Sequence, residues 1–195
     1  MSVVTLTPEL LAQACCQLSC RVKAAAFTPS LIIGIQHGGA EVARLMLKEF
    51  PEAAYCEVKL SRPGSEQKSK GLTHHLLQSM PVWCCNLLRI VESRINEWRS
   101  KGKEPVRIGE IRLPDDVTSH LIALGENAAV LLVDDAVDTG ATIHHAHLQL
   151  LKQFPGISLR VAAITVTIPH PFCEADFFLY HNRTLCRFPW SNDYR

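Results

Sequence analysis

The chain has 195 residues, enough for one α/β domain with a substantial core. Apolar residues make up 47% and the formal net charge is +1, so neither nucleic acid nor an anionic membrane is expected as the main partner. No apolar run reaches about eighteen residues, and no basic stretch followed by an apolar core opens the chain, so we expect no membrane helix or secretory signal. Eight cysteines without a C-x-x-C pair favour free thiols over disulfides or zinc, as in the cytoplasm.

The first sixty residues predict alternating helices and strands. Thr7-Pro8-Glu9 is typical of a helix start, because a Thr cap, a Pro in the first position and an acid in the first turn each favour it. Short apolar runs predict buried strands. The predicted helices are 7–26 and 37–50, and the predicted strands are 31–36 and 55–60.

The second half continues this alternation. Ile108 to Leu113 predicts a strand, and Pro114-Asp115-Asp116 opens a short helix. Leu159 to Ile168 predicts a further buried strand, which Pro169 ends. The tail contains Phe188-Pro189-Trp190, whose rings offer a flat apolar surface.

The most informative stretch is Val130 to Thr142, V-L-L-V-D-D-A-V-D-T-G-A-T. It predicts a buried strand, a ligand loop and a helix N-terminus in succession, and free N–H groups with the helix dipole favour a phosphate there. Hydroxyls and a glycine suit that phosphate, whereas Asp134 and Asp135 would repel it and are expected to face sugar hydroxyls or a hydrated Mg²⁺ ion. The pattern therefore favours a sugar phosphate as ligand.

This stretch resembles the phosphoribosyl pyrophosphate (PRPP) signature of the type I phosphoribosyltransferases, with weaker similarity over 31–62, 108–150 and 159–190. The resemblance implies an α/β fold in which helices flank a mainly parallel central sheet. It further implies a single domain over 1–195, with a helical insertion at about 73–107 and a small C-terminal hood. The implied activity is Mg²⁺-dependent transfer of the 5-phosphoribosyl group between PRPP and a nucleobase, with pyrophosphate as co-product, as in purine salvage and nucleotide metabolism.

The resemblance also implies how PRPP is held. The 5′-phosphate is expected on the loop formed by Val137, Asp138, Thr139, Gly140, Ala141 and Thr142. Asp134 and Asp135 are expected to bind the ribose hydroxyls, directly or through Mg²⁺, which makes them the metal ligands.

The implied pyrophosphate site lies after the strand at 31–36. It comprises His37, Gly38 and Gly39, with Gln36–His37 as the candidate for the cis peptide that this loop often carries in the family. Lys59 is expected to contact pyrophosphate from the next strand and is counted with the catalytic residues. The polar segment 61–71 matches a mobile loop that closes over the site in the family.

The acceptor side is less determined. In the 6-oxopurine transferases the Asp that matches Asp138 handles the N7 proton of the base, which favours a purine-like acceptor. Hypoxanthine-guanine enzymes place a Lys near the end of the strand at 159–168 to bind the 6-oxo group of the base. The approximate match here is Thr167, and this departure argues against hypoxanthine or guanine as the acceptor. Trp190 either stacks on the acceptor or serves packing.

The insertion is a second departure. Its apolar residues Trp83, Leu87, Val91, Ile95 and Trp98 share one helical face, which we interpret as core or subunit packing. The alternative is a hood that closes over the acceptor. Lys101-Gly102-Lys103 is expected to end this helix.

Two other functions fit parts of the pattern. A PRPP-sensing regulatory or binding protein would keep the loop without transferring the group, although the small net charge argues against a nucleic-acid-binding regulator. A PRPP synthetase would need paired domains, for which 195 residues are few. The expected partners are PRPP, a small acceptor and further copies of the chain in a homodimer or higher oligomer.

Overall fold

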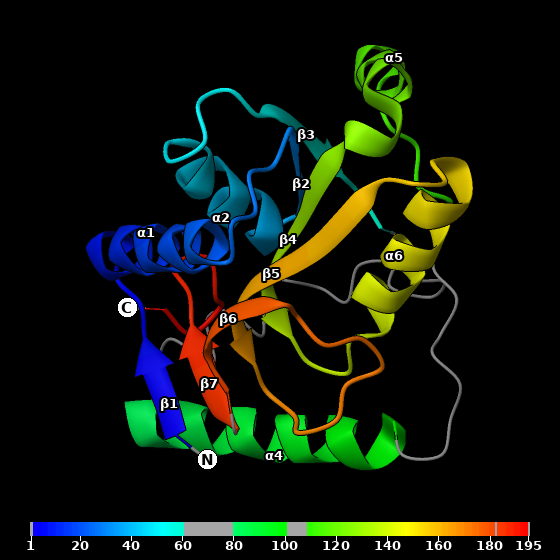
Figure 1. Cartoon of the computed structure of the whole chain (residues 1–195). Coiled ribbons are helices and arrows are strands. Elements are labelled where there is room, and N and C mark those ends of the chain that lie inside the picture. Colours follow the sequence, from blue (N-terminus) through cyan, green and yellow to red (C-terminus); the bar gives the residue numbers. More distant parts are fainter. Residues whose placement is uncertain (1, 61–79, 101–108, 182, 195) are drawn as a thin grey trace.

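The computed structural model describes residues 2–60, 80–100, 109–181 and 183–194, with Arg99 and Ser100 described by backbone only. In this part of the chain, a parallel sheet with strand order β3-β2-β4-β5-β6 forms the centre (Figure 1). Its strands are β2 (Leu31–Ile35), β3 (Ala54–Val58), β4 (Ala129–Val137), β5 (Ser158–Val166) and β6 (Phe177–Tyr180). The predicted α/β fold with a mainly parallel sheet is confirmed.

Helices cover both faces of this sheet. They are α1 (Pro8–Ala24), α2 (Gly38–Leu47), α5 (Asp115–Leu124), followed by a 3₁₀ turn (Gly125–Asn127), and α6 (Ala141–Gln153). Successive side chains of β4 point to opposite faces, so Leu131 and Val133 pack with α1 and α2, whereas Val130 and Leu132 pack with α5 and α6. Since helices cover both faces, β2 is buried along its whole length, and β4 is a continuous apolar run up to Val133, as is typical of parallel strands in α/β proteins.

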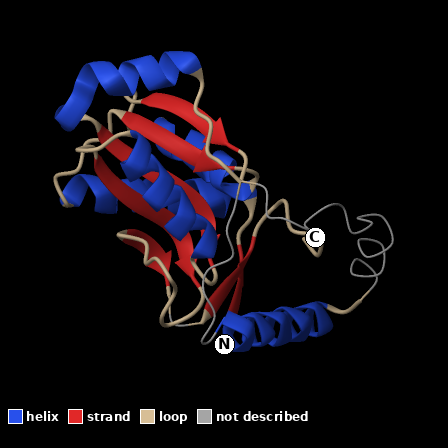
Figure 2. Cartoon of the chain, turned by 90° about the vertical axis from the view of Figure 1, so that its right-hand side faces the viewer, coloured by secondary structure: helices blue, strands red, loops and turns tan. Residues whose placement is uncertain are grey.

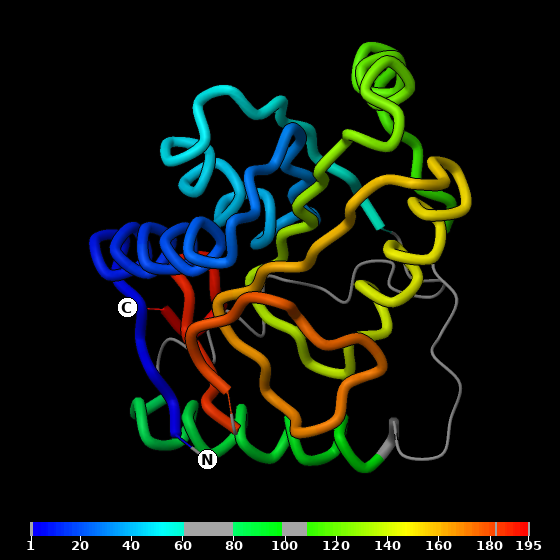
Figure 3. The backbone as a smooth tube through the Cα atoms, viewed as in Figure 1, coloured from blue at the N-terminus to red at the C-terminus, as the bar shows by residue number. Residues whose placement is uncertain are grey.

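The two ends of the chain form a small second sheet. Strand β1 (Ser2–Thr5) pairs in parallel with β7 (Thr184–Arg187), so the predicted C-terminal hood contains the N-terminus as well (Figure 3). Helix α4 (Val82–Ser100) lies below this sheet and apart from the helices that flank the central sheet (Figure 2). The hood is therefore assembled from three distant segments.

One predicted strand is wrong. Residues 109–113 form no strand, and in the described part of the chain they pair with none. Their backbone groups bond instead to side chains of α6: Ile111 N donates to Gln149 Oε1 at 2.7 Å, and Gln153 Nε2 donates to Ile111 O at 3.1 Å. These side chains satisfy backbone groups that a sheet would otherwise satisfy.

The predicted helix start at Thr7 is confirmed, because Thr7 Oγ1 accepts from Leu10 N at 3.3 Å and Pro8 is the first helical residue. The predicted mobile loop at 61–71 and the helix end at 101–103 lie outside the described residues. All eight cysteines are described, and all are free thiols. None of the helices described has the length and apolar character needed to span a membrane.

Candidate active site

The site lies where the chain direction in the sheet reverses. From β2 the chain crosses to β3 on one side of the sheet, and from β4 it crosses to β5 on the other. The loops that follow β2 and β4 therefore diverge, and such a switch point at the carboxyl ends of parallel strands is where α/β sheets bind ligands. Both sequence motifs, His37-Gly38-Gly39 and Asp138 to Thr142, follow these two strands.

Two adjacent carboxylates occupy the end of β4. Asp134 Oδ1 accepts from Asp135 N, and Asp135 Oδ1 accepts from Ala136 N, both at 2.9 Å. Burial, followed by the charge of Asp135, raises the pKa of Asp134 well above its ordinary value, and burial also raises the pKa of Asp135. Both carboxylates are thus held away from bulk water, so a cation or donating hydroxyls would stabilise their charged forms.

The glycines after β2 allow a close approach to these carboxylates. A Cβ at Gly38 would overlap the Asp135 carboxyl group and come within 2.8 Å of Trp190 Nε1. A Cβ at Gly39 would lie 2.5 Å from Val133 O and 2.7 Å from Asp134 Cα. Only glycine fits at either position. The peptide bond Gln36–His37 is cis, as the family resemblance predicts.

The loop after β4 is held against the segment that follows β5. Gly140 has φ +73°, and a Cβ there would lie 2.7 Å from Cys173 O. Phe172 N donates to Thr139 O at 2.8 Å, and Ala141 N donates to Thr139 Oγ1 at 3.4 Å. Helix α6 begins at Ala141, so the loop delivers the N-terminal N–H groups of that helix to the site.

Asp138 and Thr167 come together across two neighbouring strands. Thr167 N donates to Val137 O at 2.9 Å, which continues the β4–β5 pairing beyond the strand ends. Thr167 Oγ1 then donates to Asp138 Oδ1 at 2.7 Å. Thr167 is buried whereas Asp138 is exposed, so the hydroxyl orients a carboxylate that remains open to a ligand.

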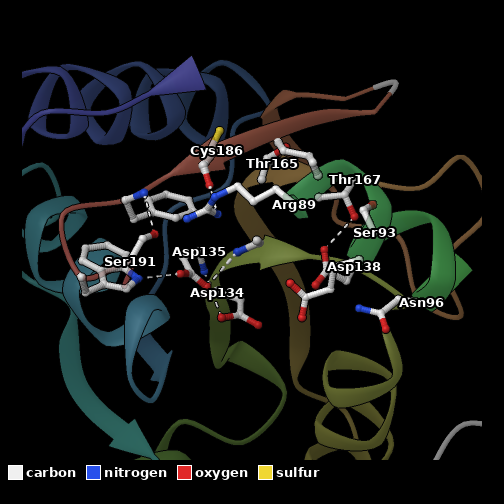
Figure 4. A pocket seen from close by; sticks show the side chains of 15 residues that line it. Arg89, Ser93, Asn96, Asp134, Asp135, Asp138, Thr165, Thr167, Cys186 and Ser191 are labelled. Atoms are coloured by element: carbon white, nitrogen blue, oxygen red, sulfur yellow. Dashed lines mark hydrogen bonds between the residues drawn. The ribbon is translucent and has the colours of Figure 1, made fainter. Parts of the chain in front are cut away.

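A pocket of about 420 Å³ opens beside these groups (Figure 4). Five of the predicted site residues line it: Asp134, Asp135, Asp138, Thr167 and Trp190. His37 and Lys59 are exposed at the ends of their strands and are not part of its wall. Other predicted residues are not in its lining: Val137 ends β4, Gly38 and Gly39 begin α2, and residues 139–142 form the turn after β4 and the start of α6.

Trp190 closes one side of this pocket. Its Nε1 donates to Asp135 Oδ2 at 2.9 Å, and its ring stacks on Phe188 with centroids 5.0 Å apart and planes 4° from parallel. The ring is therefore fixed at the end of β4 by one polar and one aromatic contact.

Helix α4 supplies the opposite wall, which the sequence reasoning did not identify. Arg89, Glu92, Ser93 and Asn96 line the pocket. The sequence does indicate a polar face of this helix, because these polar residues are spaced three and four positions apart and therefore share one side. The apolar face, which was expected to pack in the core or against another subunit, is exposed, with Trp83 and Trp98 68% and 76% exposed. Packing in the core of this chain is therefore wrong, and packing against another subunit stays a prediction.

An ion network attaches α4 to the end of the chain. Asp193 accepts from Arg187 Nε at 3.0 Å and from Arg89 Nε at 3.1 Å through Oδ2, and Arg89 also contacts its Oδ1. Arg187 continues to Asn86 Oδ1 at 2.6 Å and to Thr5 Oγ1 at 2.9 Å. One acid thereby ties α4, β1, β7 and the C-terminal segment into one unit.

Comparison with known proteins agrees with this geometry. The phosphoribosyl transferase domain model matches residues 9–166, and the chain therefore belongs to the phosphoribosyltransferase family. A search of curated protein sequences finds no match.

Solved structures share the fold at low sequence identity. A purine phosphoribosyltransferase from Pyrococcus horikoshii Ot3 is 17% identical with a TM-score of 0.61, covering 98% of this chain and 95% of its own. A xanthine-guanine-hypoxanthine phosphoribosyltransferase from Helicobacter pylori is 13% identical with a TM-score of 0.61, covering 96% and 92%. A hypothetical protein from Neisseria gonorrhoeae with bound ppGpp is 15% identical with a TM-score of 0.60, covering 97% and 89%.

Proposed function

We propose that the protein transfers the 5-phosphoribosyl group between PRPP and a nucleobase, with a purine-like acceptor favoured. The observation that carries the proposal is the carboxylate of Asp138, which Thr167 orients at 2.7 Å beside a pocket at the sheet's switch point. A carboxylate repels phosphate, so its place in a phosphate-type loop calls for another task. Accepting a proton from the acceptor is such a task.

The loop from Val137 to Thr142 would hold the 5′-phosphate through its N–H groups, the Thr139 and Thr142 hydroxyls and the N-terminus of α6. Gly38 and Gly39, with His37 and Lys59, would take the pyrophosphate. The absence of a Cβ at both glycines lets this loop lie directly against Asp134 and Asp135, which supports binding of the pyrophosphate beside the two carboxylates.

The two carboxylates of β4 fit a magnesium site. Among the described residues no cluster of three His, Cys, Asp or Glu side chains could hold a metal. Mg²⁺ is commonly held by only one or two carboxylates, with substrate phosphates and water supplying the rest. Asp134 and Asp135 would provide those ligands, and the raised pKa values of these buried, adjacent carboxyl groups support the proposal, because a nearby cation would stabilise their charged forms. When bound, the ion would neutralise charge on the pyrophosphate.

In the forward reaction the bond between C1′ and the pyrophosphate oxygen breaks, and that oxygen leaves with the electron pair. A ring nitrogen of the acceptor forms the new bond to C1′. Asp138 takes the proton that the acceptor ring loses as this bond forms, which in a purine is the proton on N7. Thr167 and Trp190 would contact the acceptor, since both line the pocket next to Asp138 and Asp135.

We further propose that the chain forms a homodimer or higher homo-oligomer. The exposed apolar side of α4 supports this, because large apolar patches on a protein surface commonly mark interaction sites. Static light scattering of the purified chain tests the proposal, and a monomer mass at micromolar concentration would contradict it.

Release of pyrophosphate from PRPP tests the transferase proposal. Purified protein with Mg²⁺ is assayed against purines, pyrimidines and related amines, and release is expected only when both PRPP and a suitable acceptor are present. Tight PRPP binding without release for any acceptor would instead support a PRPP-binding regulatory protein.

A further inference from the structure

Helix α4 turns its polar side toward the pocket. Arg89, Ser93 and Asn96 follow one another at spacings of four and three residues, so they form one stripe, and all three line the pocket (Figure 4). The apolar side carries Trp83 and Trp98 and faces outward. A helix that served only to close the hood would bury its apolar side, so the polar stripe points to a role in ligand binding.

Ser93 provides the second, independent observation. Its side chain is 9% exposed, and within the described parts of the chain its Oγ has no hydrogen-bond partner. Ser19 in α1 shows the usual alternative, because its buried Oγ donates to Cys15 O at 2.9 Å, one turn earlier. A buried hydroxyl that does not make this bond and lies on the pocket wall is available to a ligand.

Carboxylates dominate the charged groups of the described pocket wall, where Asp134, Asp135, Asp138 and Glu92 stand against the single guanidinium of Arg89. Several donors already have partners in the chain: Thr165 Oγ1 donates to Thr184 O at 2.7 Å, Thr167 Oγ1 to Asp138 Oδ1 at 2.7 Å, and Trp190 Nε1 to Asp135 Oδ2 at 2.9 Å. Arg89 uses three of its five N–H groups on Asp193 and on Cys186 O. A threonine hydroxyl has one proton, so Thr165 and Thr167 can only accept from a ligand.

Acceptor groups, in contrast, remain open. Glu92 and Asp138 place carboxylates on the wall, and the oxygens of Thr165, Thr167 and Asn96 add further lone pairs. Such a wall suits a ligand edge that donates hydrogen bonds. It disfavours a ligand carboxylate, which would meet four carboxylates of the described wall against one guanidinium, that of Arg89, which is itself paired with Asp193.

We infer that Ser93 and Asn96 determine acceptor specificity and that the acceptor is an amino-substituted, uncharged heterocycle. The exocyclic amine donates to the oxygens of the wall, and the Ser93 hydroxyl completes its missing hydrogen bond on the same ring. This inference rests on the proposed phosphoribosyl transfer, because it assigns the acceptor of that reaction.

Binding of nucleoside 5′-monophosphates, as products of the reaction, tests it by calorimetry. AMP and IMP differ by an amine against an oxo group, and so do CMP and UMP, whereas orotidine 5′-monophosphate carries a carboxylate. Ribose 5-phosphate is the probe without a base. At least one amino form is expected to bind about tenfold tighter than its oxo partner, and the carboxylate form is expected to bind weakest, since an unpaired polar group in a pocket is costly.

Variants separate specificity from folding. Ser93→Ala is expected to weaken binding of the preferred amino nucleotide about three- to tenfold, because one neutral hydrogen bond is lost. The affinity for ribose 5-phosphate should be unchanged. Ser19→Ala, the matched control, should change neither affinity. Asn96→Ala replaces a partly exposed helical residue by the best helix former and gives a second measure if Ser93→Ala is poorly folded.

Equal or tighter binding of the oxo form in both pairs would overturn the amino-acceptor assignment. Unchanged affinity in both α4 variants would overturn the role of the stripe, as would an equal loss for ribose 5-phosphate. If wild-type protein failed to bind ribose 5-phosphate at all, the proposed function would be contradicted, and the inference would fall with it.

Discussion

Thr167 Oγ1 donates a hydrogen bond of 2.7 Å to Asp138 Oδ1, from the residue that follows β5 to the residue that follows β4. The bond fixes a carboxylate beside the pocket without neutralising it. The hydroxyl proton of Thr167 is used in this bond. Thr167 therefore orients Asp138 in addition to any contact that it makes with the acceptor.

Thr167→Val should therefore lower kcat by about tenfold or more. The change keeps the shape of a buried side chain but removes a hydrogen bond to a charged group, which is worth about 1.5–3 kcal/mol. Thr167→Ser retains the hydroxyl and should keep most of the activity. Steady-state kinetics check this, and an unchanged kcat in Thr167→Val would show that the hydrogen bond to Asp138 does not matter for turnover.

Asp138→Asn should keep PRPP binding while lowering turnover severely, by about 10²–10⁴. The amide still accepts from Thr167 but cannot take a proton from the acceptor. Calorimetry with PRPP and pre-steady-state turnover separate the two properties. Asp115→Asn, at an exposed position in the first turn of α5, is the control and should leave both intact. A parallel loss of PRPP affinity in Asp138→Asn would refute the proton-handling role.

Gly38→Ala should abolish measurable PRPP binding. The new Cβ would overlap the carboxyl group of Asp135, so the acid must leave the position in which Trp190 holds it. Gly125→Ala is the control: no atom lies within 4 Å of its Cβ, and although its φ of +54° with ψ of −130° strains an alanine, the variant should lose global stability and keep its PRPP affinity. Wild-type PRPP affinity in Gly38→Ala would exclude the close approach.

Asp193→Ala should destabilise the hood by about 3–5 kcal/mol, because it leaves Arg187 and Arg89 without their shared acid at a buried site. Glu49→Gln breaks the surface pair with Lys23 and should change the free energy of unfolding very little, because exposed ion pairs are screened by solvent. Chemical denaturation gives both values. Similar small losses in both variants would mean that the network does not hold the hood.

The same acid predicts a pH dependence. Burial alone would raise the pKa of Asp193, but hydrogen bonds from Arg89 and Arg187 outweigh it and lower the pKa below its ordinary value of 3.8. A lowered pKa contributes stability at pH values above 3.8, and this contribution is lost as the pH falls through the folded-state pKa. The free energy of unfolding of the wild type should thus fall more steeply below about pH 4 than that of Asp193→Asn. Parallel pH profiles for the two proteins would contradict this.

The central strand and its loop were predictable from sequence, because their signals are local. The thirteen residues from Val130 to Thr142 contain an apolar run, acids, hydroxyls and one glycine. These signals mark the end of β4 and the start of α6. The pairing of β1 with β7 was not predictable in this way. Each strand has four residues, and their partners lie at opposite ends of the chain.

The errors have a common physical cause. Ile111 lies in a stretch with the composition of a strand, yet Gln149 and Gln153 satisfy its backbone, a contact that no sequence period reveals. In α4 the apolar stripe is the stronger periodic signal, whereas the weaker polar stripe with Ser93 lines the pocket. Periodicity shows that a helix has two faces but not which one meets the site.

Formation of the N-glycosidic bond tests the central claim most directly. Purified protein is incubated with PRPP, Mg²⁺ and a panel of nucleobases and amines, and products are identified by mass spectrometry, with Asp138→Asn in parallel. We predict that the wild type forms a phosphoribosylated acceptor, most readily from an amino-substituted base, and that Asp138→Asn forms it at least a hundredfold more slowly, on the order expected for loss of a proton acceptor. Absence of any phosphoribosylated product from the wild type across the panel would contradict the account.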